Sequence, residues 1–360
     1  MRLLPVSRAV GLQLARDIPA PDPSQMPLLR SGARLTERYA RALVDAGVPA
    51  VWVDDQLSEG VEPVELLPPH VRQEVAQKVS AALGDARTAL ADRQPLPPEA
   101  LDALSAVVDR IVASVAAHSG TAVVLSDLAA ADAYTHQHCI DVCALGVLLG
   151  RELFARAGWQ DDRGRYHVDG IDRRLHRLGL GLLLHDIGKL AIPLAILNKP
   201  GALTSEETAI VRRHPEDGAL MLDGDAWSPV IRAIVREHHE RWNGTGYPQG
   251  LAGRSIHQLA RLAAVADVYD AVTSQRPYQP ARPAHVGYDI IVQGAGTQFD
   301  PEVAAVFRRL VHRFPVGSEI TLADGSRGVV AAVDADDPER PTVRLPSGER
   351  RVDLTAERAA

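Results

Sequence analysis

Cysteine and lysine are scarce in this chain, and each scarcity excludes something. Only two cysteines occur, Cys139 and Cys143, so neither a disulfide framework nor a zinc site built on several thiolates is expected. They lie four residues apart in a helical pattern, which favours small buried side chains. Lysine occurs only at positions 78, 189 and 199, although arginine is abundant. A compact ammonium group differs chemically from a planar guanidinium, so this bias favours a specific role for Lys189.

Long hydrophobic runs are also absent. No stretch approaches the about 20 apolar residues that span a bilayer, and residues 1–20 lack the apolar core of a signal peptide. We therefore expect a cytoplasmic protein without a membrane partner. The formal net charge of -7 argues against a general nucleic-acid-binding protein. A small anionic nucleotide remains compatible with that charge, because a metal site sets its own local field.

The 360 residues suffice for two or three domains, and the apolar pattern divides them into four parts. Residues 1–65 are predicted to form a small α/β accessory module, and residues 313–360 a small antiparallel β module. Residues 66–122 read as two helices, either a connector, a dimerising element or the first helices of the main domain. Residues 123–312 form the main domain. The predicted fold class is therefore mainly α, with α/β and β appendages.

The main domain is organised around an apolar helical run that ends in His185 and Asp186. Its leucines recur at helical spacing, so we expect a buried helix whose end presents both side chains. Imidazole nitrogen with carboxylate oxygen suits zinc, manganese, iron or nickel, and it also suits hydrolysis of phosphate esters. An isolated His-Asp pair would more simply be a carboxylate that orients a core histidine. Residues 158–174, just before this helix, are polar and predicted to form a surface loop.

Other histidines and one aspartate favour the metal interpretation. His214 lies at the junction of two predicted helices, and His238 and His239 end another apolar helix. Asp267 lies among alanines, where an unpartnered carboxylate would be costly to bury. His138 falls on the buried face of an upstream helix, and alone it would be read as a core histidine. Together with His185 and Asp186, these residues are enough for two metal ions that share one carboxylate.

Several segments, taken in order, resemble the HD-GYP family, a branch of the HD-domain phosphohydrolases. They are His185-Asp186-Ile187-Gly188-Lys189, His238-His239-Glu240 and Gly244-Thr245-Gly246-Tyr247-Pro248, with further similarity over residues 196–204, 266–278 and 298–301. The resemblance covers about residues 123–312. It implies a helical HD-type bundle around two or three metal ions and a phosphodiesterase for the bacterial messenger cyclic di-GMP.

The resemblance also implies roles for single residues. One metal would be held by His138, His185, Asp186 and Asp267, with Asp186 bridging to a second metal held by His214, His238 and His239. Lys189 resembles a phosphate-contacting lysine, and Tyr247 and Arg276 resemble substrate-loop residues. Two positions depart from the family pattern. Tyr134 stands where some members have a glutamate for a third metal, so we expect two divalent ions, iron or manganese before others. Asn243 stands where the family usually has aspartate, and it keeps the shape without the charge.

These observations lead to one expected function and two alternatives. A metal-activated hydroxide would hydrolyse cyclic di-GMP to pGpG, which a second cut would turn into GMP, with Asp186 holding the metal pair and Lys189 balancing charge on the phosphate. The first alternative is an HD phosphohydrolase acting on another cyclic nucleotide or dinucleotide. The second is a metal-bound cyclic di-GMP sensor of low activity. Residues 244–248 could also bind diguanylate cyclase-type or other signalling proteins, and a homodimer is compatible with the sequence.

Overall fold

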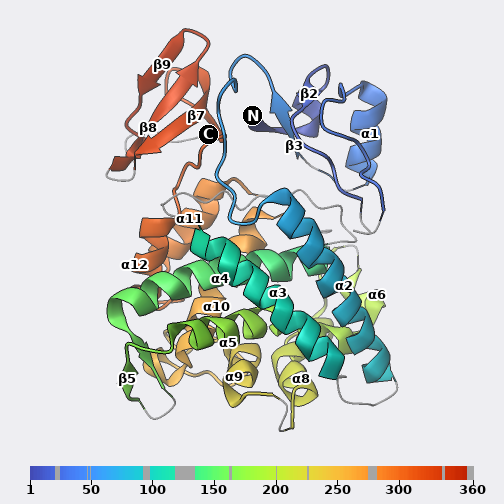
Figure 1. Cartoon of the computed structure of the whole chain (residues 1–360), viewed down its shortest axis with the longest axis vertical. Helices are drawn as coiled ribbons and strands as arrows, with labels where there is room; N and C mark the ends of the chain where they lie inside the picture. Colours follow the sequence, from blue (N-terminus) through green and yellow to red (C-terminus); the bar gives the residue numbers. More distant parts are fainter. Residues whose placement is uncertain are drawn as a thin grey trace.

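The computed structural model describes residues 1–20, 25–46, 48, 50–91, 98–117, 134–161, 164–199, 201–224, 227–274, 282–334 and 337–354. Within these ranges, a body of helices lies below two small sheets, one from each end of the chain (Figure 1). The mainly α fold with small terminal sheets is therefore confirmed. The boundaries of the four parts stay a prediction.

The first sheet is antiparallel and has the strand order β1-β3-β2. Its strands are β1 (Arg2–Pro5), β2 (Gln13–Leu14) and β3 (Ala50–Asp54), and α1 (Glu37–Asp45) lies between the last two in the chain. The helix begins after Thr36, whose hydroxyl accepts a hydrogen bond from the amide of Tyr39 at 3.2 Å. Leu4, Val51 and Leu43 are buried together, so sheet and helix share a small core of their own.

The helical body is one packed unit with a large apolar core. Its longer helices are α2 (Pro69–Ala91), α3 (Pro98–Ala117), α4 (Tyr134–Ala157), α5 (Ile171–Leu184), α9 (Pro229–Glu237), α10 (Gln258–Thr273), α11 (Ala284–Gln293) and α12 (Pro301–Leu310). Val75 of α2 and Val108 of α3 lie in the same core as α4 and α5, so these two helices belong to the body's packing. Among the described residues, no helix combines the length and the apolar character that crossing a membrane requires.

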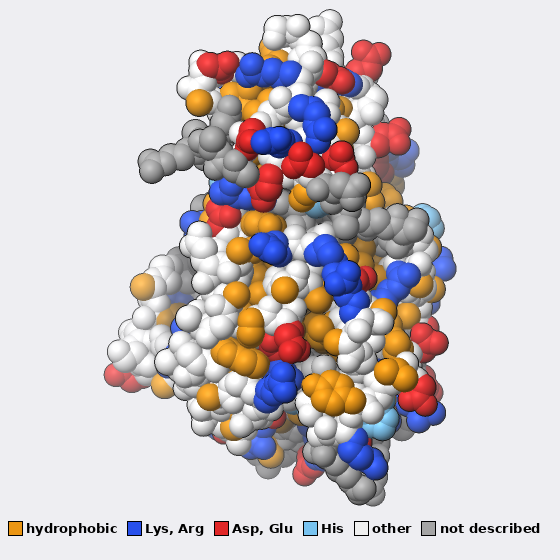
Figure 2. Space-filling view, turned by 90° about the vertical axis from the view of Figure 1, so that its left-hand side faces the viewer, with side chains coloured by type: hydrophobic (Ala, Val, Ile, Leu, Met, Phe, Trp, Pro, Cys, Tyr) orange, Lys and Arg blue, Asp and Glu red, His pale blue; other side chains and the backbone are white. Residues whose placement is uncertain are grey.

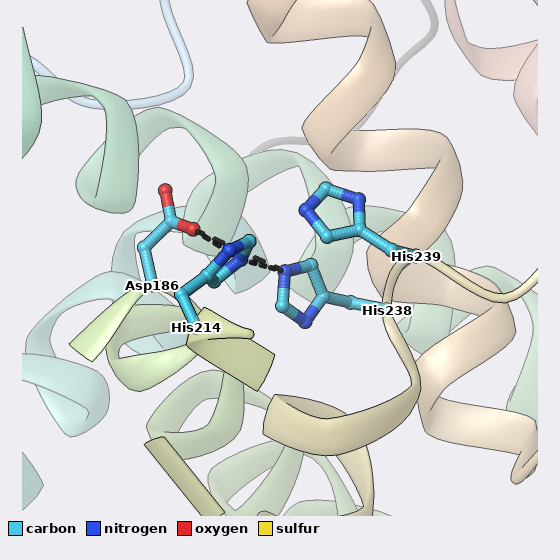
Figure 3. A group of neighbouring side chains, drawn as sticks. All are labelled: Asp186, His214, His238 and His239. Atoms are coloured by element: carbon cyan, nitrogen blue, oxygen red, sulfur yellow. Dashed lines mark hydrogen bonds and ion pairs between the residues drawn. The ribbon is translucent and has the colours of Figure 1, made fainter. Parts of the chain in front are cut away.

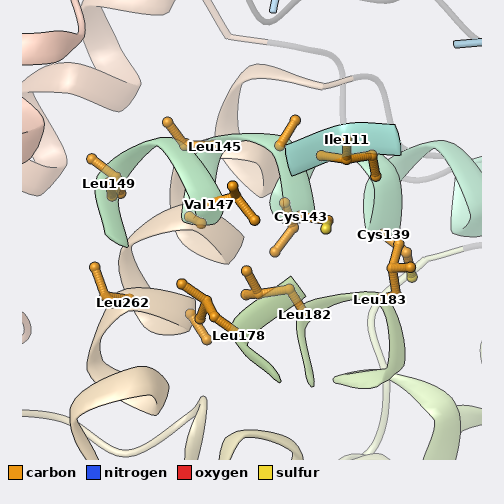
Figure 4. Packing of buried hydrophobic residues seen from close by; sticks show 14 of the residues in the cluster. Ile111, Cys139, Cys143, Leu145, Val147, Leu149, Leu178, Leu182, Leu183 and Leu262 are labelled. Carbon is orange, nitrogen blue, oxygen red and sulfur yellow. The ribbon is translucent and has the colours of Figure 1, made fainter. Parts of the chain in front are cut away.

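Glycines let the central helices approach closely. A Cβ added at Gly146 of α4 would lie 2.4 Å from a methyl of Leu182, and one at Gly181 of α5 would lie 2.3 Å from a methyl of Ile234 in α9. Figure 4 shows Leu178 and Leu182 of α5 between α4 and α10, with Cys143 nearby. Both cysteines are buried and free, as predicted. The position of α5, and with it the position of its C-terminal end, is thus fixed from two sides.

The segment before α5 corrects one prediction. Residues 158–174 were expected to form a surface loop, but β4 (Trp159–Gln160) and β5 (Tyr166–His167) pair as a short antiparallel hairpin, and α5 already begins at Ile171. The indole of Trp159 stacks on His167 with ring centroids 4.4 Å apart, and its Nε1 donates to the carbonyl of Asp169 at 2.7 Å. This aromatic pair stabilises a turn that its polar sequence does not predict.

The second sheet consists of β6 (Glu319–Thr321), β7 (Arg327–Asp334), β8 (Asp337–Leu345) and β9 (Gly348–Arg351), paired antiparallel in that order. It contacts the first sheet: Arg2 forms an ion pair with Glu319 at 3.0 Å, and the amide of Leu3 donates to the carbonyl of Gly317. In the upper part of Figure 2, side chains of both charges lie next to one another. The second sheet itself contains ion pairs, among them Arg344 with Glu349 and Arg340 with Asp353.

Candidate metal centre

Helix α5 delivers the His-Asp pair into the body. The helix ends at Leu184, His185 follows as its last capping residue, and the 3-10 helix η3 (Ile187–Ala191) starts directly after Asp186. Nδ1 of His185 donates to the carbonyl of Leu182 at 2.7 Å. A carbonyl only accepts, so the proton lies on Nδ1 and the lone pair of Nε2 points into the body. Both His185 and Asp186 are buried.

His214 and His238 are oriented in the same way as His185. His214 opens α8 (His214–Met221), and its Nδ1 donates to the carbonyl of Val211; His238 follows α9, and its Nδ1 donates to the carbonyl of Val235, both at 2.8 Å. Their Nε2 atoms therefore face each other at 3.3 Å with no proton between them. Two facing lone pairs repel each other, and a cation between them removes that repulsion.

Asp186 lies between two groups of candidate ligands. Its Oδ1 is 3.2 Å from Nε2 of His214, and with His238 and His239 these residues place ligand atoms within 4.8 Å of one another (Figure 3). Its Oδ2 is 3.4 Å from Nε2 of His185 and 3.6 Å from that of His138, which form the second group. Oδ1 is buried without a hydrogen-bond partner. A carboxylate in this position is suited to bridging two cations.

Asp267 and Asp270 of α10 complete the side of the centre around His138. Oδ1 of Asp267 lies 3.3 Å from Nε2 of His138 and 3.9 Å from Nε2 of His185. Oδ2 of Asp270 lies 2.6 Å from Nδ1 of His138, and its other oxygen accepts from the hydroxyl of Ser274 at 2.8 Å. Asp270 thereby holds the proton of His138 on Nδ1 and turns Nε2 toward Asp186 and Asp267. Nothing local to Asp270 predicts this contact, which depends on the packing of α10 against α4.

The electrostatics match what metal ligands require. Burial opposes ionisation of Asp186, but the charge of Lys189 and the neighbouring His185 outweigh it and hold its pKa well below the usual value. Burial and the adjacent histidines lower the pKa of His238 well below its usual value, and burial lowers the pKa of His239 to about 3. Ionised carboxylates and neutral imidazoles are the forms that bind metals.

His138 is the exception among the histidines. Burial opposes its charge, but hydrogen bonds to Asp267 and Asp270 outweigh burial and raise its pKa to about 9. A cation bound between His138 and Asp267 would take the place of that extra proton. The charge balance at this side of the centre therefore calls for a positive species, either a proton or a metal ion.

Lys189 reaches the centre from η3. Its Nζ lies 2.5 Å from Oδ2 of Asp186, and its side chain is 30% exposed. The preceding Gly188 lets η3 pass against α8, because a Cβ there would lie 1.9 Å from the carbonyl oxygen of His214. The glycine between Asp186 and Lys189 therefore brings the two halves of the centre together.

The loop after His239 packs over the same centre. The ring of Tyr247 stacks on His239 with centroids 4.7 Å apart, and the amide of Tyr247 donates to the carbonyl of His239. Buried Glu240 anchors the loop by accepting from the amides of Gln249 and Leu251 at 2.7 and 3.0 Å. Burial, with the nearby Asp267 and Asp186, raises the pKa of Tyr247, so its phenol stays neutral.

The structure thus brings together the seven predicted ligands, Lys189 and Tyr247. Asn243 also lies in this loop, where its Oδ1 accepts from the amide and the hydroxyl of Thr245 at 3.1 and 2.7 Å. Arg276, predicted to contact substrate, lies outside the described residues, as does the side chain of Tyr134. Sequence reasoning missed Asp270 as a partner of His138 and Glu240 as an anchor.

Comparison with known proteins shows what this centre resembles. Residues 169–303 match the HD domain family. The resemblance to the HD-GYP branch that the motifs predicted is thereby confirmed. The matched residues include α5, η3, α8, α9 and α10. They therefore contain all candidate ligands except His138.

Curated relatives share this part of the chain. A cyclic di-GMP phosphodiesterase of Pseudomonas aeruginosa is 42% identical over 227 residues, which are 63% of this chain and 51% of the relative. A cyclic di-GMP phosphodiesterase of Vibrio cholerae is 42% identical over 36% of this chain and 28% of its own. A 3'3'-cGAMP-specific phosphodiesterase of the same organism is 34% identical over 51% and 41%. The chain spans about half or less of the curated relatives that it matches.

Proposed function

We propose that this protein is a metal-dependent phosphodiesterase that hydrolyses cyclic di-GMP to linear pGpG and, in a second cut, to GMP. The observation that supports it best is the position of Asp186. Its two oxygens face two separate groups of histidines, and one of them is buried without a hydrogen-bond partner. A buried, ionised and unpartnered carboxylate oxygen is costly unless a cation is bound there.

The proposed ligand set follows from the geometry. His138, His185, Asp186 and Asp267 would hold one divalent ion, and Asp186, His214, His238 and His239 the other. Nitrogen and carboxylate ligands fit iron or manganese. When bound, such ions polarise the phosphate and lower the pKa of water toward neutrality. The protein's own part is to fix the ligand lone pairs inward, which the hydrogen bonds on Nδ1 of His138, His185, His214 and His238 do.

Two side chains are placed to contact the substrate. Lys189 is partly exposed and lies against Asp186, so its ammonium can turn to a non-bridging phosphate oxygen and stabilise the charge that develops there. Tyr247 keeps its proton and can donate a hydrogen bond from above His239. Lys189 is thus proposed to contact the reacting phosphate. Asp186 is proposed to hold both ions.

A second substrate has support of its own. One relative is named as specific for 3'3'-cGAMP, and the candidate ligands contact phosphate rather than base, so they do not distinguish guanine from adenine. The sensor of low activity is the remaining candidate. The complete ligand set favours an enzyme over such a sensor, because signal binding alone does not require every ligand.

The deciding experiment is hydrolysis by purified protein loaded without oxygen with Fe(II) or Mn(II). We expect cyclic di-GMP to yield pGpG or GMP on chromatography, and 3'3'-cGAMP to be cut more slowly. Preferred cleavage of 3'3'-cGAMP would transfer the proposal to that substrate. Two bound ions with no product from either dinucleotide would favour first another cyclic nucleotide as substrate and then the sensor.

Partners other than substrate are also proposals. The loop at residues 244–248 is half-buried to exposed and is anchored by Glu240, so it presents a fixed shape to a diguanylate cyclase-type or other signalling protein. Mixing experiments with a purified cyclase, using the intact chain and a variant with Thr245→Glu, would test this contact. A homodimer is tested by light scattering of the same samples.

A further inference from the structure

A second cation lies at the mouth of the centre, in addition to Lys189. The guanidinium of Arg212 sits over the ring of Tyr247, with Cζ 4.7 Å from the ring centroid. The same ring stacks on His239. Arg212 and the candidate ligand His239 therefore contact the same aromatic ring.

The mouth of the centre lies on the His239 side. The side chains of His138, His185, His214 and His238 are 2% exposed or less, whereas that of His239 is 24% exposed. A substrate reaches the buried ligands past the least buried one. Tyr247 and Arg212 therefore lie where the part of the substrate outside the reacting phosphate would rest.

Arg212 also differs from the other arginine beside it. Arg213 forms an ion pair with Asp217 at 3.3 Å and faces a pocket lined by Ile210, Leu220 and Met221. Arg212 is exposed, and no ion pair to it is found within the described ranges. Its guanidinium lies over the ring of Tyr247, and the N–H groups of a guanidinium point outward within its own plane. That arrangement is suited to binding an anion in a forked, bidentate manner.

We propose that Arg212 binds the second, non-scissile phosphodiester of a cyclic dinucleotide. This inference rests on the proposed function, because it assigns a substrate contact at the same centre. A cyclic dinucleotide carries two phosphates, and the ions with Lys189 account for only one. Stacking on Tyr247 fixes the guanidinium before substrate arrives, so binding costs little side-chain entropy. Arg212 would thus favour two-phosphate rings over simple phosphodiesters.

The test compares Arg212→Gln with Arg213→Gln as the matched control. Binding of a fluorescent cyclic di-GMP is measured by stopped flow before turnover, and hydrolysis is measured for cyclic di-GMP and for bis(p-nitrophenyl) phosphate, which has one phosphate. For Arg212→Gln we expect Kd and KM for cyclic di-GMP to rise about tenfold, as for a lost charge-assisted hydrogen bond. The kcat, the thermal midpoint and the hydrolysis of bis(p-nitrophenyl) phosphate should stay unchanged, and Arg213→Gln should resemble the wild type.

Salt dependence tests whether Arg212 acts through its charge on an anionic group. Loss of an ionic contact makes log Kd less dependent on log salt, because salt screens the attraction between guanidinium and phosphate. An unchanged slope, or equal loss on both substrates, would overturn the proposal. If wild type binds cyclic di-GMP and Arg212→Gln binds it equally, only this proposal is wrong. If the wild type neither binds nor cuts any cyclic dinucleotide, the proposed function is wrong as well.

Discussion

The five histidines of the centre fall into two sets that are oriented by different means. His185, His214 and His238 each donate to a backbone carbonyl three residues earlier, so each is oriented by the end of the helix that precedes it. His138 and His239 depend on distant residues, one on the carboxylate of Asp270 and the other on the ring of Tyr247. The first set is fixed once its helix forms, whereas the second requires helices and a loop to dock correctly.

This difference has a consequence for function. The locally oriented histidines are buried to 1% exposure or less, and they form a rigid base on which the ions can be held. His239 is the more exposed one and lies under a loop. Substitutions at the shared residue, at each set and in the loop test this division.

The largest effect is expected at Asp186, which belongs to both groups of candidate metal ligands. Asp186→Ala should remove both ions and lower the hydrolysis of cyclic di-GMP by at least about a thousandfold, while far-UV circular dichroism stays close to that of the wild type. Metal content by elemental analysis is the measurement. Asp172→Ala, on the exposed face of the same helix, serves as the control. Full metal occupancy in Asp186→Ala would contradict the bridging position.

Lys189 touches the shared carboxylate but neither set of histidines. Lys189→Ala should lower kcat about a hundredfold, as for one lost donor to a developing oxyanion, and leave metal content nearly unchanged. Lys199→Ala is the matched control. Lys199 lies away from the centre, and its Nζ forms an ion pair with Glu207 at 2.6 Å. Equal losses of metal and of turnover in Lys189→Ala would show that the lysine holds Asp186 rather than the phosphate.

Asp270 is expected to affect only the ion on the His138 side of the centre. Asp270→Asn keeps the shape but weakens the hold on Nδ1 of His138, so affinity for the ion on that side should fall about 10- to 100-fold. The ion near His214 and His238 should be retained, and titration with Mn(II) followed by electron paramagnetic resonance counts both sites. Asp289→Asn, which breaks an ion pair with Arg313 at 2.8 Å, is the control. Loss of both ions would mean that the two ion sites are not independent.

The same division explains how much of the centre was predictable from sequence. His185 and His238 end apolar helices, and His214 stands at a junction preceded by a capping box of Thr204 and Glu207, which the structure shows. These are patterns within one or two turns, and periodicity detects them. The helical body and the buried cysteines were predictable for the same reason.

Features that depend on long-range packing could not be predicted in this way. Asp270 meets His138 across 132 residues of chain, and Glu240 accepts from amides that only the folded loop presents. The hairpin at β4 and β5 contains a stack between Trp159 and His167 within a polar sequence. In each case the partner is set by tertiary contact, which overrides local composition.

The smallest effect is expected at Asn243, the loop residue that departs from the family pattern. Its Oδ1 acts only as an acceptor, from the amide and hydroxyl of Thr245, and a carboxylate accepts the same two hydrogen bonds. Asn243→Asp should therefore change kcat/KM less than twofold and the free energy of unfolding by about 0.5 kcal/mol or less. Asn243→Ala removes the acceptor and should cost about 1 kcal/mol, measured by urea denaturation. A large loss of kcat/KM in Asn243→Asp would show that the loop does not accept a further negative charge. It would also mean that the aspartate usual in the family is held there by contacts that this chain lacks.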